Sequence, residues 1–299
     1  MHSKTNRKLI EWAETSENSM ATKIHFTKMH GCGNNYIYVY LPDNPIADLS
    51  RAAVEWSKPH VGIGSDGLIT IEPSDKADFK MRIFNNDGSE AMMCGNGVRC
   101  CGKFVRDHHL TEQKTVTFET LSGIKVLDLY EDEQGVVTAA RVDMGEPVLS
   151  DKRQCATSDG SMQLGDVNGM KGTFVSMGNP HDVIFVDEID QIDLESIGAQ
   201  FEHHPLFPER VNTEFAQILP DGTIRMRVWE RGSGITMACG TGACATSVAA
   251  TLTQHTGRTN TIIMDGGTLQ IEWGEDNHVY MTGPAVTVFE GEVSLPETT

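Results

Sequence analysis

The sequence lacks any apolar run near the roughly 18 residues that a membrane-spanning helix needs. Basic residues are also scarce, because 24 Lys and Arg stand against 42 Asp and Glu, a formal charge of −18. Nucleic acids and anionic membranes bind clustered Lys and Arg, so neither is expected as a partner. Residues 1–22 contain no apolar core of a signal peptide. We expect them to form a mobile extension, and we expect the protein to be cytoplasmic.

Patterns for metal and cofactor binding are missing too. The seven cysteines are an odd number in a long chain, which indicates free thiols and not a disulfide framework. Zinc proteins favour C-x2–4-C and H-x3–5-H spacings, and neither occurs in the cysteine-rich segment from Cys94 to His109. The glycine-rich stretches lack the third glycine of a dinucleotide-binding motif, and no lysine has the flanking pattern of a pyridoxal site. We therefore expect no metal and no cofactor.

The most informative feature that is present is an internal repeat. The segment MRIFNNDGSEAMMCGNGVRC begins at Met81, and MRVWERGSGITMACGTGACA begins 145 residues later, at Met226. A Cys-Gly-x-Gly motif follows each start at the same spacing, at Cys94 and Cys239, and Gly-Asn pairs at 33 and 178 keep the same offset. The repeat predicts two copies of one domain, related by pseudo-twofold symmetry, with a ligand site between them.

Strand patterns dominate each copy. FKMRIFN, TVTFETL, IKVLDLY, VTAARVDM, TIRMRVWE, TLQIEW and HVYMTG alternate in polarity or are rich in β-branched and aromatic residues. The strongest helix patterns, GVRCCGKFVRDH and GACATSVAATLTQ, start within the two Cys-Gly-x-Gly motifs and are apolar on several faces. We therefore predict an α+β fold in which each helix is buried within its own sheet.

A cysteine followed by glycines at a helix start is a reactive arrangement. The first turn of a helix leaves backbone N–H groups unpaired and carries positive potential, and glycines let an anion approach. A thiol there is expected to have a lowered pKa, roughly 3.5–7.5. One such motif could be a phosphate cradle, a reactive thiol or a tight turn. Two of them related by symmetry would place Cys94 and Cys239 across one site, with two helix starts aimed at one anion.

Such a pair would suit inversion of an amino-acid α-carbon. The α-proton is weakly acidic because its removal adds charge next to a carboxylate, and donors at a helix start stabilise that charge. Inversion also needs a base on one face and an acid on the other, and a thiolate and a thiol can exchange these roles. The sequence thus predicts a cofactor-independent epimerase of a small amino acid. A non-catalytic anion-binding protein is the alternative from another class.

The motifs together resemble those of diaminopimelate epimerase. They are KMHGCGNNY, GIGSDG, RIFNNDGSEAMMCGNGVRC, MGNPH, RVNTEFAQI and WERGSGITMACGTGACA, and the resemblance runs from about Ile24 to Phe289. It implies two pseudosymmetric domains, each a mostly antiparallel curved sheet around a central helix. The first would span residues 23–148 with a returning strand at 285–299, and the second residues 149–284. It also implies interconversion of LL- and meso-diaminopimelate, in lysine and peptidoglycan-precursor biosynthesis.

The resemblance assigns roles to residues at matching positions. Cys94 and Cys239 match the two acid/base cysteines. The reacting carboxylate is expected at the two helix starts, on the pairs Gly95-Asn96 and Gly240-Thr241. The remaining substrate contacts are expected from Asn34, Asn85, Asn179, Asn212, Glu230 and Arg231, of which Asn85, Asn212 and Arg231 would read the distal L-centre.

Two further positions have implied roles. His181, together with Glu230, matches the pair that tunes the thiols, and Phe289 stands where some members have a tyrosine linked to dimerisation, which implies a homodimer. Structural alternatives stay open for several residues. The asparagines could serve turns or caps, Arg231 could be a solvated surface charge, and His181 could simply end a turn.

A few positions depart from the family pattern. Gly67 stands where some members have a substrate-contacting Gln, Ile235 where Glu is common, and Asp182 where a small or apolar residue is common. None of these changes removes a catalytic atom. They leave open a racemase of another amino acid, such as histidine, on the same fold. Retention of the three residues for the distal centre favours diaminopimelate, because a smaller substrate has no distal carboxylate.

Overall fold

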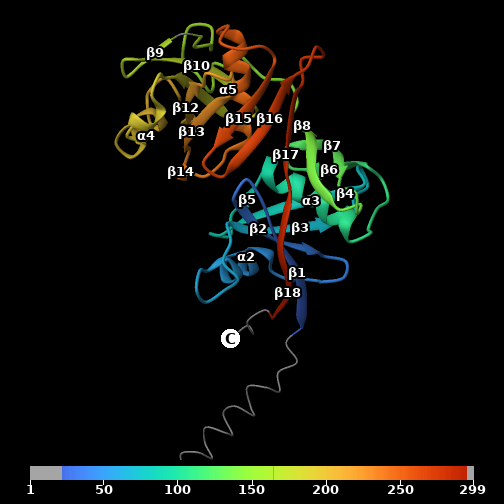
Figure 1. Ribbon diagram of the computed structural model, residues 1–299. Helices are drawn as coiled ribbons and strands as arrows, with labels where there is room; N and C mark the ends of the chain where they lie inside the picture. The colour runs from blue at the N-terminus through green and yellow to red at the C-terminus, as the bar shows by residue number, and fades with distance from the viewer. Residues whose placement is uncertain (1–21, 164, 295–299) are drawn as a thin grey trace, which may run out of the picture.

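The computed structural model describes residues 22–163 and 165–294 of the chain. The predicted extension at residues 1–22 lies outside the described residues, except for its last residue. The described chain forms two halves, each with a curved sheet around a central helix (Figure 1). We call residues 22–143 together with the last strand the N half, and residues 165–284 the C half.

The elements of the N half are β1 (Lys23–Gly31), β2 (Asn34–Tyr40), α2 (Leu49–Ser57), β3 (Gly67–Glu72), β4 (Phe79–Asn85), β5 (Glu90–Ala91), α3 (Gly95–Asp107), β6 (Thr115–Thr120), β7 (Gly123–Glu131), β8 (Val137–Asp143) and β18 (Val286–Ser294). The elements of the C half are β9 (Gly165–Val167), β10 (Met170–Ser176), β11 (Pro180–Phe185), the 3-10 helix η1 (Ile189–Gln191), α4 (Leu194–Glu202), β12 (Asn212–Ile218), β13 (Ile224–Glu230), β14 (Gly234–Thr236), α5 (Gly240–Leu252), β15 (Thr259–Met264), β16 (Gly267–Trp273) and β17 (Val279–Pro284).

The strands form where the sequence alternates in polarity. In β4 the side chains of Phe79, Met81 and Ile83 are buried, whereas those of Lys80 and Arg82 are partly exposed. This is the period of two that one buried sheet face requires. The predicted strand segments are confirmed in β4, β6, β7, β8, β13, β16 and β17.

The strands join into one continuous sheet. Their order is β18-β1-β2-β3-β4-β6-β7-β8-β17-β16-β15-β13-β12-β11-β10-β9, with β5 beside β4 and β14 beside β13. Neighbours are antiparallel except β2–β3 and β4–β6 in the N half and β11–β12 and β13–β15 in the C half. The predicted α+β class, with mostly antiparallel curved sheets, is confirmed.

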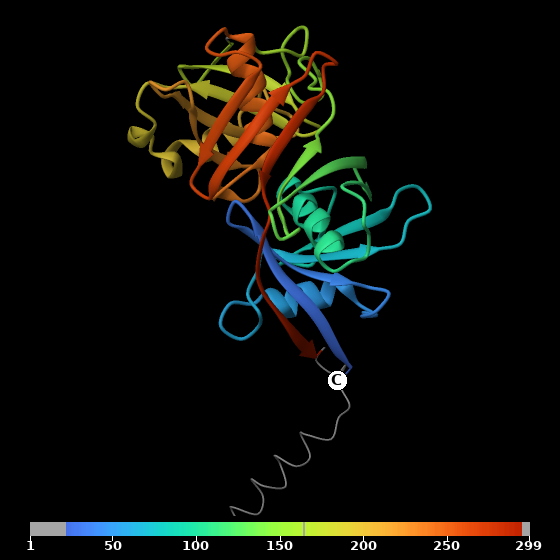
Figure 2. The ribbon, with the colours of Figure 1, turned by 45° about the vertical axis from the view of Figure 1, so that its right-hand side comes forward.

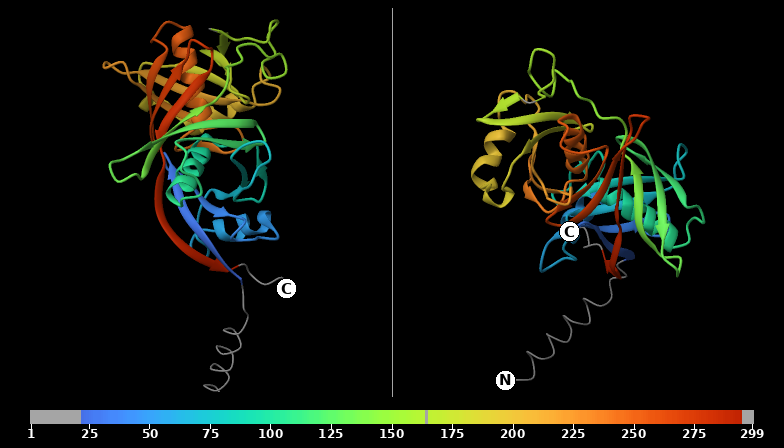
Figure 3. Two further views of the ribbon diagram at one scale, coloured as in Figure 1. Left: turned by 90° about the vertical axis from the view of Figure 1, so that its right-hand side faces the viewer. Right: turned by 45° about the horizontal axis from the view of Figure 1, so that its top comes forward.

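The last two strands connect the halves. β17 pairs with β16 and also with β8 of the N half, and the chain then continues into β18, which pairs with β1 (Figures 2 and 3). The end of the chain therefore returns to the N half. Because the sheet runs through the β8–β17 pair without a break, the predicted domain boundaries after residues 148 and 284 stay predictions.

The sequence repeat is a structural repeat as well. The offset of 145 residues separates α2 from α4, β4 from β13 and α3 from α5. The helices α2 and α4 were not among the predicted ones. Each has only nine residues, so its periodic signal is short, and each begins at an aspartate, Asp48 or Asp193, whose side chain accepts a backbone N–H of the first turn.

The helices α3 and α5 are the two that the sequence predicted, and both are confirmed. Nearly all of their residues are buried. Close packing against the sheet needs small residues; a Cβ on Gly102 of α3 would lie 2.7 Å from the Leu129 side chain. The surrounding sheet thus holds each helix in a fixed place. No helix among the described residues is long and apolar enough to cross a membrane.

Candidate active site

Cys94 and Cys239 occupy the same position in the two halves. Each is the N-cap of a central helix and has extended backbone, with φ −133° for Cys94 and −122° for Cys239. The side chain therefore turns back over the first helical turn. The Cys94 Sγ accepts the Gly97 N–H and the Cys239 Sγ accepts the Gly242 N–H, both at 3.4 Å. Both thiols thus lie at helix starts, as the motifs predicted.

The second glycine of each motif is needed because the helix start rests on a side chain beneath it. A Cβ on Gly97 would lie 2.7 Å from the Cδ1 of Ile69, and a Cβ on Gly242 would lie 2.5 Å from the Oε1 of Glu214. Ile69 and Glu214 are themselves 145 residues apart. The same place is therefore apolar under α3 and acidic under α5.

The two helix starts lie against each other where the halves meet. A Cβ placed on Gly240 would be 3.9 Å from the Cα of Gly95. The side chain of Met281 contacts both glycines, since Cβ atoms on Gly95 and Gly240 would lie 2.7 and 3.1 Å from it. The first turns of α3 and α5, and the thiols that cap them, are thereby brought to one place.

Amide side chains surround Cys94. Its S–H donates to Asn34 Oδ1 at 3.2 Å, and Asn96 Nδ2 reaches the same oxygen at 3.4 Å. The Asn34 Nδ2 donates to Asp66 at 2.9 Å, which fixes the direction of the amide. Asp66 was not among the predicted site residues. The GIGSDG segment that contains it was noticed only as part of the resemblance.

A chain of polar contacts leads away from Cys239. The Thr241 hydroxyl lies 3.6 Å from the Cys239 Sγ, and Asn179 Nδ2 donates to this hydroxyl at 3.3 Å. The Oδ1 of Asn179 accepts from His181 Nε2 at 3.2 Å. Asn179 and Thr241 are the counterparts, at the same offset, of Asn34 and Asn96. Each thiol is thus flanked by one residue of the helix start and by one asparagine, which is the first residue of β2 in the N half and directly precedes β11 in the C half.

His181 is bonded to a carboxylate that was not among the predicted site residues. The His181 Nδ1 is 2.7 Å from the Oε1 of Glu214, and both side chains are fully buried. Glu230 accepts a hydrogen bond from the Thr236 hydroxyl. The parallel pairing of β11 and β12 explains the contact of His181 with Glu214, because His181 is opposite Asn212 and Glu214 lies two residues further on the same face. That pairing is invisible in the sequence.

Glu230 still acts on the site through its charge. Burial raises the pKa of the Glu230 carboxyl, while the Thr236 hydroxyl and the charge of His181 lower it. The Glu230 carboxylate in turn raises the pKa of both Cys94 and Cys239. Glu230 therefore reaches the thiols of both halves.

The pKa values of the thiols run opposite to the expectation of a helix-start thiolate. Burial raises the pKa of Cys94, although the Gly97 N–H and the charge of Arg99 lower it. Burial raises the pKa of Cys239 further above its ordinary value, and the carboxylates of Glu230 and Glu214 add to this rise. The cost of burying a thiolate thus exceeds the stabilisation by the helix start.

Asn212 and Arg231 are brought together at the adjacent ends of β12 and β13. The Asn212 Oδ1 accepts the backbone N–H of Arg231 at 2.9 Å, and its Nδ2 donates to the Pro180 carbonyl at 2.9 Å. The Arg231 guanidinium donates to the Glu209 carbonyl at 2.9 Å. Both side chains are held by neutral partners, so the Arg231 charge is free to meet a carboxylate.

Asn85 has a local role in this structure. Its Nδ2 donates to the Ser89 hydroxyl at 3.0 Å, within the turn between β4 and β5. This is the turn role that the sequence left open for asparagine. Asn85 is the last residue of β4. Its counterpart in the repeat, 145 residues later, is Glu230, the last residue of β13.

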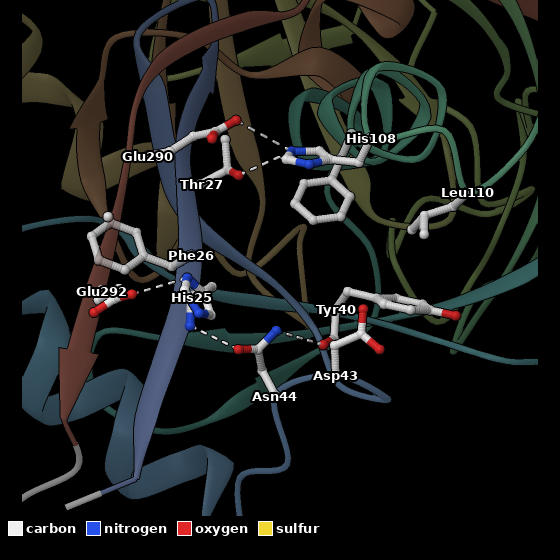
Figure 4. Close-up of a pocket in the computed structure, with 12 residues that line it drawn as sticks. His25, Phe26, Thr27, Tyr40, Asp43, Asn44, His108, Leu110, Glu290 and Glu292 are labelled. Atoms are coloured by element: carbon white, nitrogen blue, oxygen red, sulfur yellow. Dashed lines mark hydrogen bonds and ion pairs between the residues drawn. The ribbon is translucent and has the colours of Figure 1, made fainter.

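The predicted dimerisation residue lies on the edge strand β18. Phe289 is 45% exposed and packs edge-to-face on Phe26 at 5.8 Å between ring centroids. A hollow of about 500 Å³ lies near it (Figure 4). Part of its lining comes from the C-terminal end of α3, about 20 Å along the helix from Cys94. The hollow is lined by His25, Phe26, Thr27, Tyr40, Asp43, Asn44, Phe104, His108, Leu110, Glu290, Gly291 and Glu292, and none of these is a predicted substrate contact.

The fold belongs to a class that includes epimerases. The solved structure of a phenazine biosynthesis protein of the PhzF family from Bacillus anthracis matches with a TM-score of 0.68 at 17% identity, over 92% of this chain and 100% of that one. A hydroxyproline epimerase from Agrobacterium vitis, with bound trans-4-hydroxy-L-proline, matches with a TM-score of 0.63 at 15% identity, over 91% of each chain. At such identities the likeness defines the two-domain fold alone.

Sequence similarity defines the family. The family model of diaminopimelate epimerase matches residues 26–150 and 173–288. Diaminopimelate epimerases of Phocaeicola vulgatus and Bacteroides thetaiotaomicron are 59% and 60% identical, each over 92% of this chain and over 100% and 99% of their own lengths. The chain belongs to the diaminopimelate epimerase family.

Proposed function

We propose that this protein is an isomerase that interconverts LL- and meso-diaminopimelate, in lysine and peptidoglycan-precursor biosynthesis. The family and the identity of about 60% to relatives with that name support the substrate. The observation that carries the mechanism is the meeting of two helix starts, each capped by a thiol. An anion-binding protein would need the helix starts but neither cysteine.

The chemistry follows from this arrangement. One thiolate removes the α-proton, so that an S–H bond forms while the C–H bond breaks and its electron pair stays on the substrate. The added charge spreads onto the α-carboxylate, which the first-turn N–H groups of Gly95-Asn96 and Gly240-Thr241 stabilise. The other thiol then gives its proton to the opposite face and becomes the thiolate. Cys94 and Cys239 exchange roles in each turnover.

The charges around the two thiols differ. The guanidinium of Arg99 lowers the pKa of Cys94, whereas the carboxylates of Glu230 and Glu214 raise the pKa of Cys239. The chain from Cys239 through Thr241 and Asn179 to the buried His181–Glu214 pair keeps the second thiol in a fixed orientation. Orientation matters because the proton must arrive on one face only.

The residues at the adjacent ends of β12 and β13 would bind the distal end of the substrate. Arg231 carries a planar fork that suits a carboxylate, and the Asn212 amide lies beside its backbone. Asn85 donates one amide N–H to Ser89, and its second N–H and its Oδ1 remain to meet a substrate. A distal carboxylate and ammonium distinguish diaminopimelate from histidine, so this end decides between the two candidate substrates.

We also propose that the enzyme is a cytoplasmic homodimer. All seven cysteines are free, which suits a reducing compartment. The edge strand β18 exposes Val286, Val288 and Phe289, which a second copy would cover. Sedimentation of the wild type and of Phe289→Ser would test this, since a dimer held through β18 should dissociate in the variant.

Proton exchange with solvent tests the activity directly. The protein is incubated with LL-diaminopimelate in D₂O, and loss of the α-proton signal is followed by NMR, with histidine as the competing substrate. We expect exchange of diaminopimelate alone. Exchange of histidine alone would support the racemase, and exchange of neither, with diaminopimelate still bound, would support the anion-binding protein.

A further inference from the structure

Arg99 lies inside the N half and has no acidic partner among the described residues. Its side chain is fully buried, and its bulk exceeds that of every other fully buried side chain among the described residues. Its donors go to neutral groups: the Gly95 carbonyl at 3.2 Å, the Asn96 Oδ1 at 2.9 Å and the Pro284 carbonyl at 3.2 Å. A buried charge without a counter-ion costs several kcal/mol in a protein interior. An anion bound beside it would therefore be strongly favoured.

The surrounding chain leaves room for the guanidinium at the first turn of α3. A Cβ on Gly31 would lie 2.8 Å from the Arg99 Nη2, and a Cβ on Gly283 would lie 3.1 Å from its Nε. Larger residues in either strand would push the group away. The guanidinium folds back toward the helix start, because its Nη1 donates to the carbonyl of Gly95, the residue next to the catalytic thiol.

The C half has no such charge at the matching place. The residue 145 positions after Arg99 is Cys244, which is buried and lies at the same place in α5. The charges near Cys239 of α5 are instead the carboxylates of Glu214, which is fully buried, and Glu230, which is half-buried. The start of α3 thus has a buried cation beside it that has no counterpart in the C half.

We propose that Arg99 is a positioning residue for the reacting carboxylate: its unpaired charge lies behind the first turn of α3, and its hydrogen bond sets the direction of Asn96. This inference rests on the proposed function, in which the α-carboxylate binds at the two helix starts. The bound carboxylate is then the counter-ion that Arg99 lacks within the protein.

One set of hydrogen bonds and one electrostatic effect support this role. Because the Asn96 Oδ1 accepts from Arg99, its Nδ2 must face the site, where it donates to Asn34 Oδ1. The charge of Arg99 also reaches the site itself, since it lowers the pKa of Cys94. Arg99 thus acts on both the orientation and the electrostatic potential of the α3 start without touching the substrate.

The first test uses alkylation and needs no epimerase activity. The wild type is treated with iodoacetate or with iodoacetamide, and the rate ratio of the anionic to the neutral reagent is measured at each cysteine by peptide mapping. The ratio cancels the fraction of thiolate. We expect a ratio at Cys94 several-fold above that of an unstructured cysteine peptide, and a lower ratio at Cys239. A ratio at Cys94 no higher than that of the peptide would overturn the proposal.

The second test compares Arg99→Met with Arg99→Lys. Arg99→Met removes the charge at similar length, so the reagent ratio at Cys94 should fall to near that of the peptide, while Cys239 serves as the internal control. For diaminopimelate we expect KM to rise at least tenfold, with partial recovery in Arg99→Lys. If Arg99 were only a packing residue, the thermal midpoint would fall but the ratio and KM of the folded fraction would stay unchanged.

The outcomes are separable from those of the proposed function. Absence of proton exchange in the wild type would reject the epimerase. The alkylation ratio would still test whether Arg99 attracts an anion to the start of α3, because it does not depend on turnover. Normal exchange with an unchanged KM in folded Arg99→Met would reject the role of Arg99 alone. If Arg99→Met does not fold, the wild-type ratio and the Arg99→Lys variant still decide the question.

Discussion

The two halves share one backbone plan but carry opposite charges at the helix starts. Under α3 lies the apolar side chain of Ile69, and the nearest buried charge is the guanidinium of Arg99. Under α5 lies Glu214, and Arg99 is replaced by Cys244. A duplicated framework has thus kept its geometry while its buried charges have diverged. This is what a pair of thiols needs when one must be ionised and the other protonated.

The divergence extends to a second buried carboxylate of the C half. Asp182 is fully buried on β11, and both of its carboxyl oxygens lack a hydrogen-bond partner in the described structure. Its counterpart in the N half is Ile37, which is also fully buried. The N half therefore has the simpler apolar core at two places where the C half has acids. Each of the following predictions tests one part of this contrast.

The largest effect is expected from the feature that the halves share. Cys94→Ala and Cys239→Ala should each lower kcat for epimerisation by about 10²–10⁴-fold, because inversion needs an acid and a base. Binding of diaminopimelate, measured by calorimetry, should change little, since the helix starts and Arg231 remain. Cys155→Ala, in a buried cysteine away from the helix starts, is the matched control. Near-normal turnover in either active-site variant would rule out the two-base mechanism.

Glu214→Gln should make the α5 start electrically more like that of α3. A carboxylate that raises the pKa of Cys239 is removed, so Cys239 should react with iodoacetamide at lower pH than in the wild type. His181 loses its charged partner, and kcat should fall by about tenfold to a hundredfold, the loss of one charge-assisted hydrogen bond. The pH profile of alkylation at each cysteine is the measurement.

The control for this variant is Glu195→Gln, which removes a charge from the exposed face of α4. It should leave both alkylation profiles in place. A shift of the same size at Cys94 and Cys239 in Glu214→Gln would show that Glu214 does not distinguish the two thiols, and the contrast between the halves would fail.

Arg231→Lys tests the part of the site that has no counterpart in the N half. The lysine keeps the charge but not the planar fork, so kcat/KM for diaminopimelate should fall by roughly tenfold. Arg227→Lys, on β13 but bonded to the Ile192 carbonyl, is the matched control and should be close to normal. Equal activity of Arg231→Lys and wild type would mean that the residue does not read a carboxylate.

The last prediction concerns stability and not catalysis, through Asp182 and the pH dependence of unfolding. Burial raises the pKa of Asp182 to about 8 from its ordinary 3.8. The unfolded chain therefore loses this proton at lower pH than the folded chain, and folding stability should decline as pH rises from about 4 to about 8. The decline from this group should be about 1 kcal/mol per pH unit. It should be absent in Asp182→Asn.

Urea unfolding of both proteins across this pH range measures the effect, because the difference between them removes the contributions of all other groups. A constant difference from pH 4 to pH 8 would mean that Asp182 does not titrate in that range. The Ile37 position offers no comparable group, so no equivalent slope is expected from the N half.

Much of the architecture was predictable because the signals are local. Alternation of polarity located the strands β4, β6, β7 and β8, and the Cys-Gly-x-Gly motifs located both central helices and the capping thiols. The repeat predicted the two halves, since equal sequences fold into equal local structure. The short helices α2 and α4 were missed because two and a half turns give too weak a period.

The sequence by itself thus determined the fold class, the duplicated plan and the two cysteines that cap the central helices, all of which depend on residues close together in the chain. Tertiary structure alone decided the charges around them. It placed Glu214 against His181, through the pairing of two strands. It left Arg99 without a counter-ion and raised the pKa of both thiols by burial, against the expectation from the helix starts. Burial and strand pairing join residues far apart in sequence, and the electrostatics of a site depends on both.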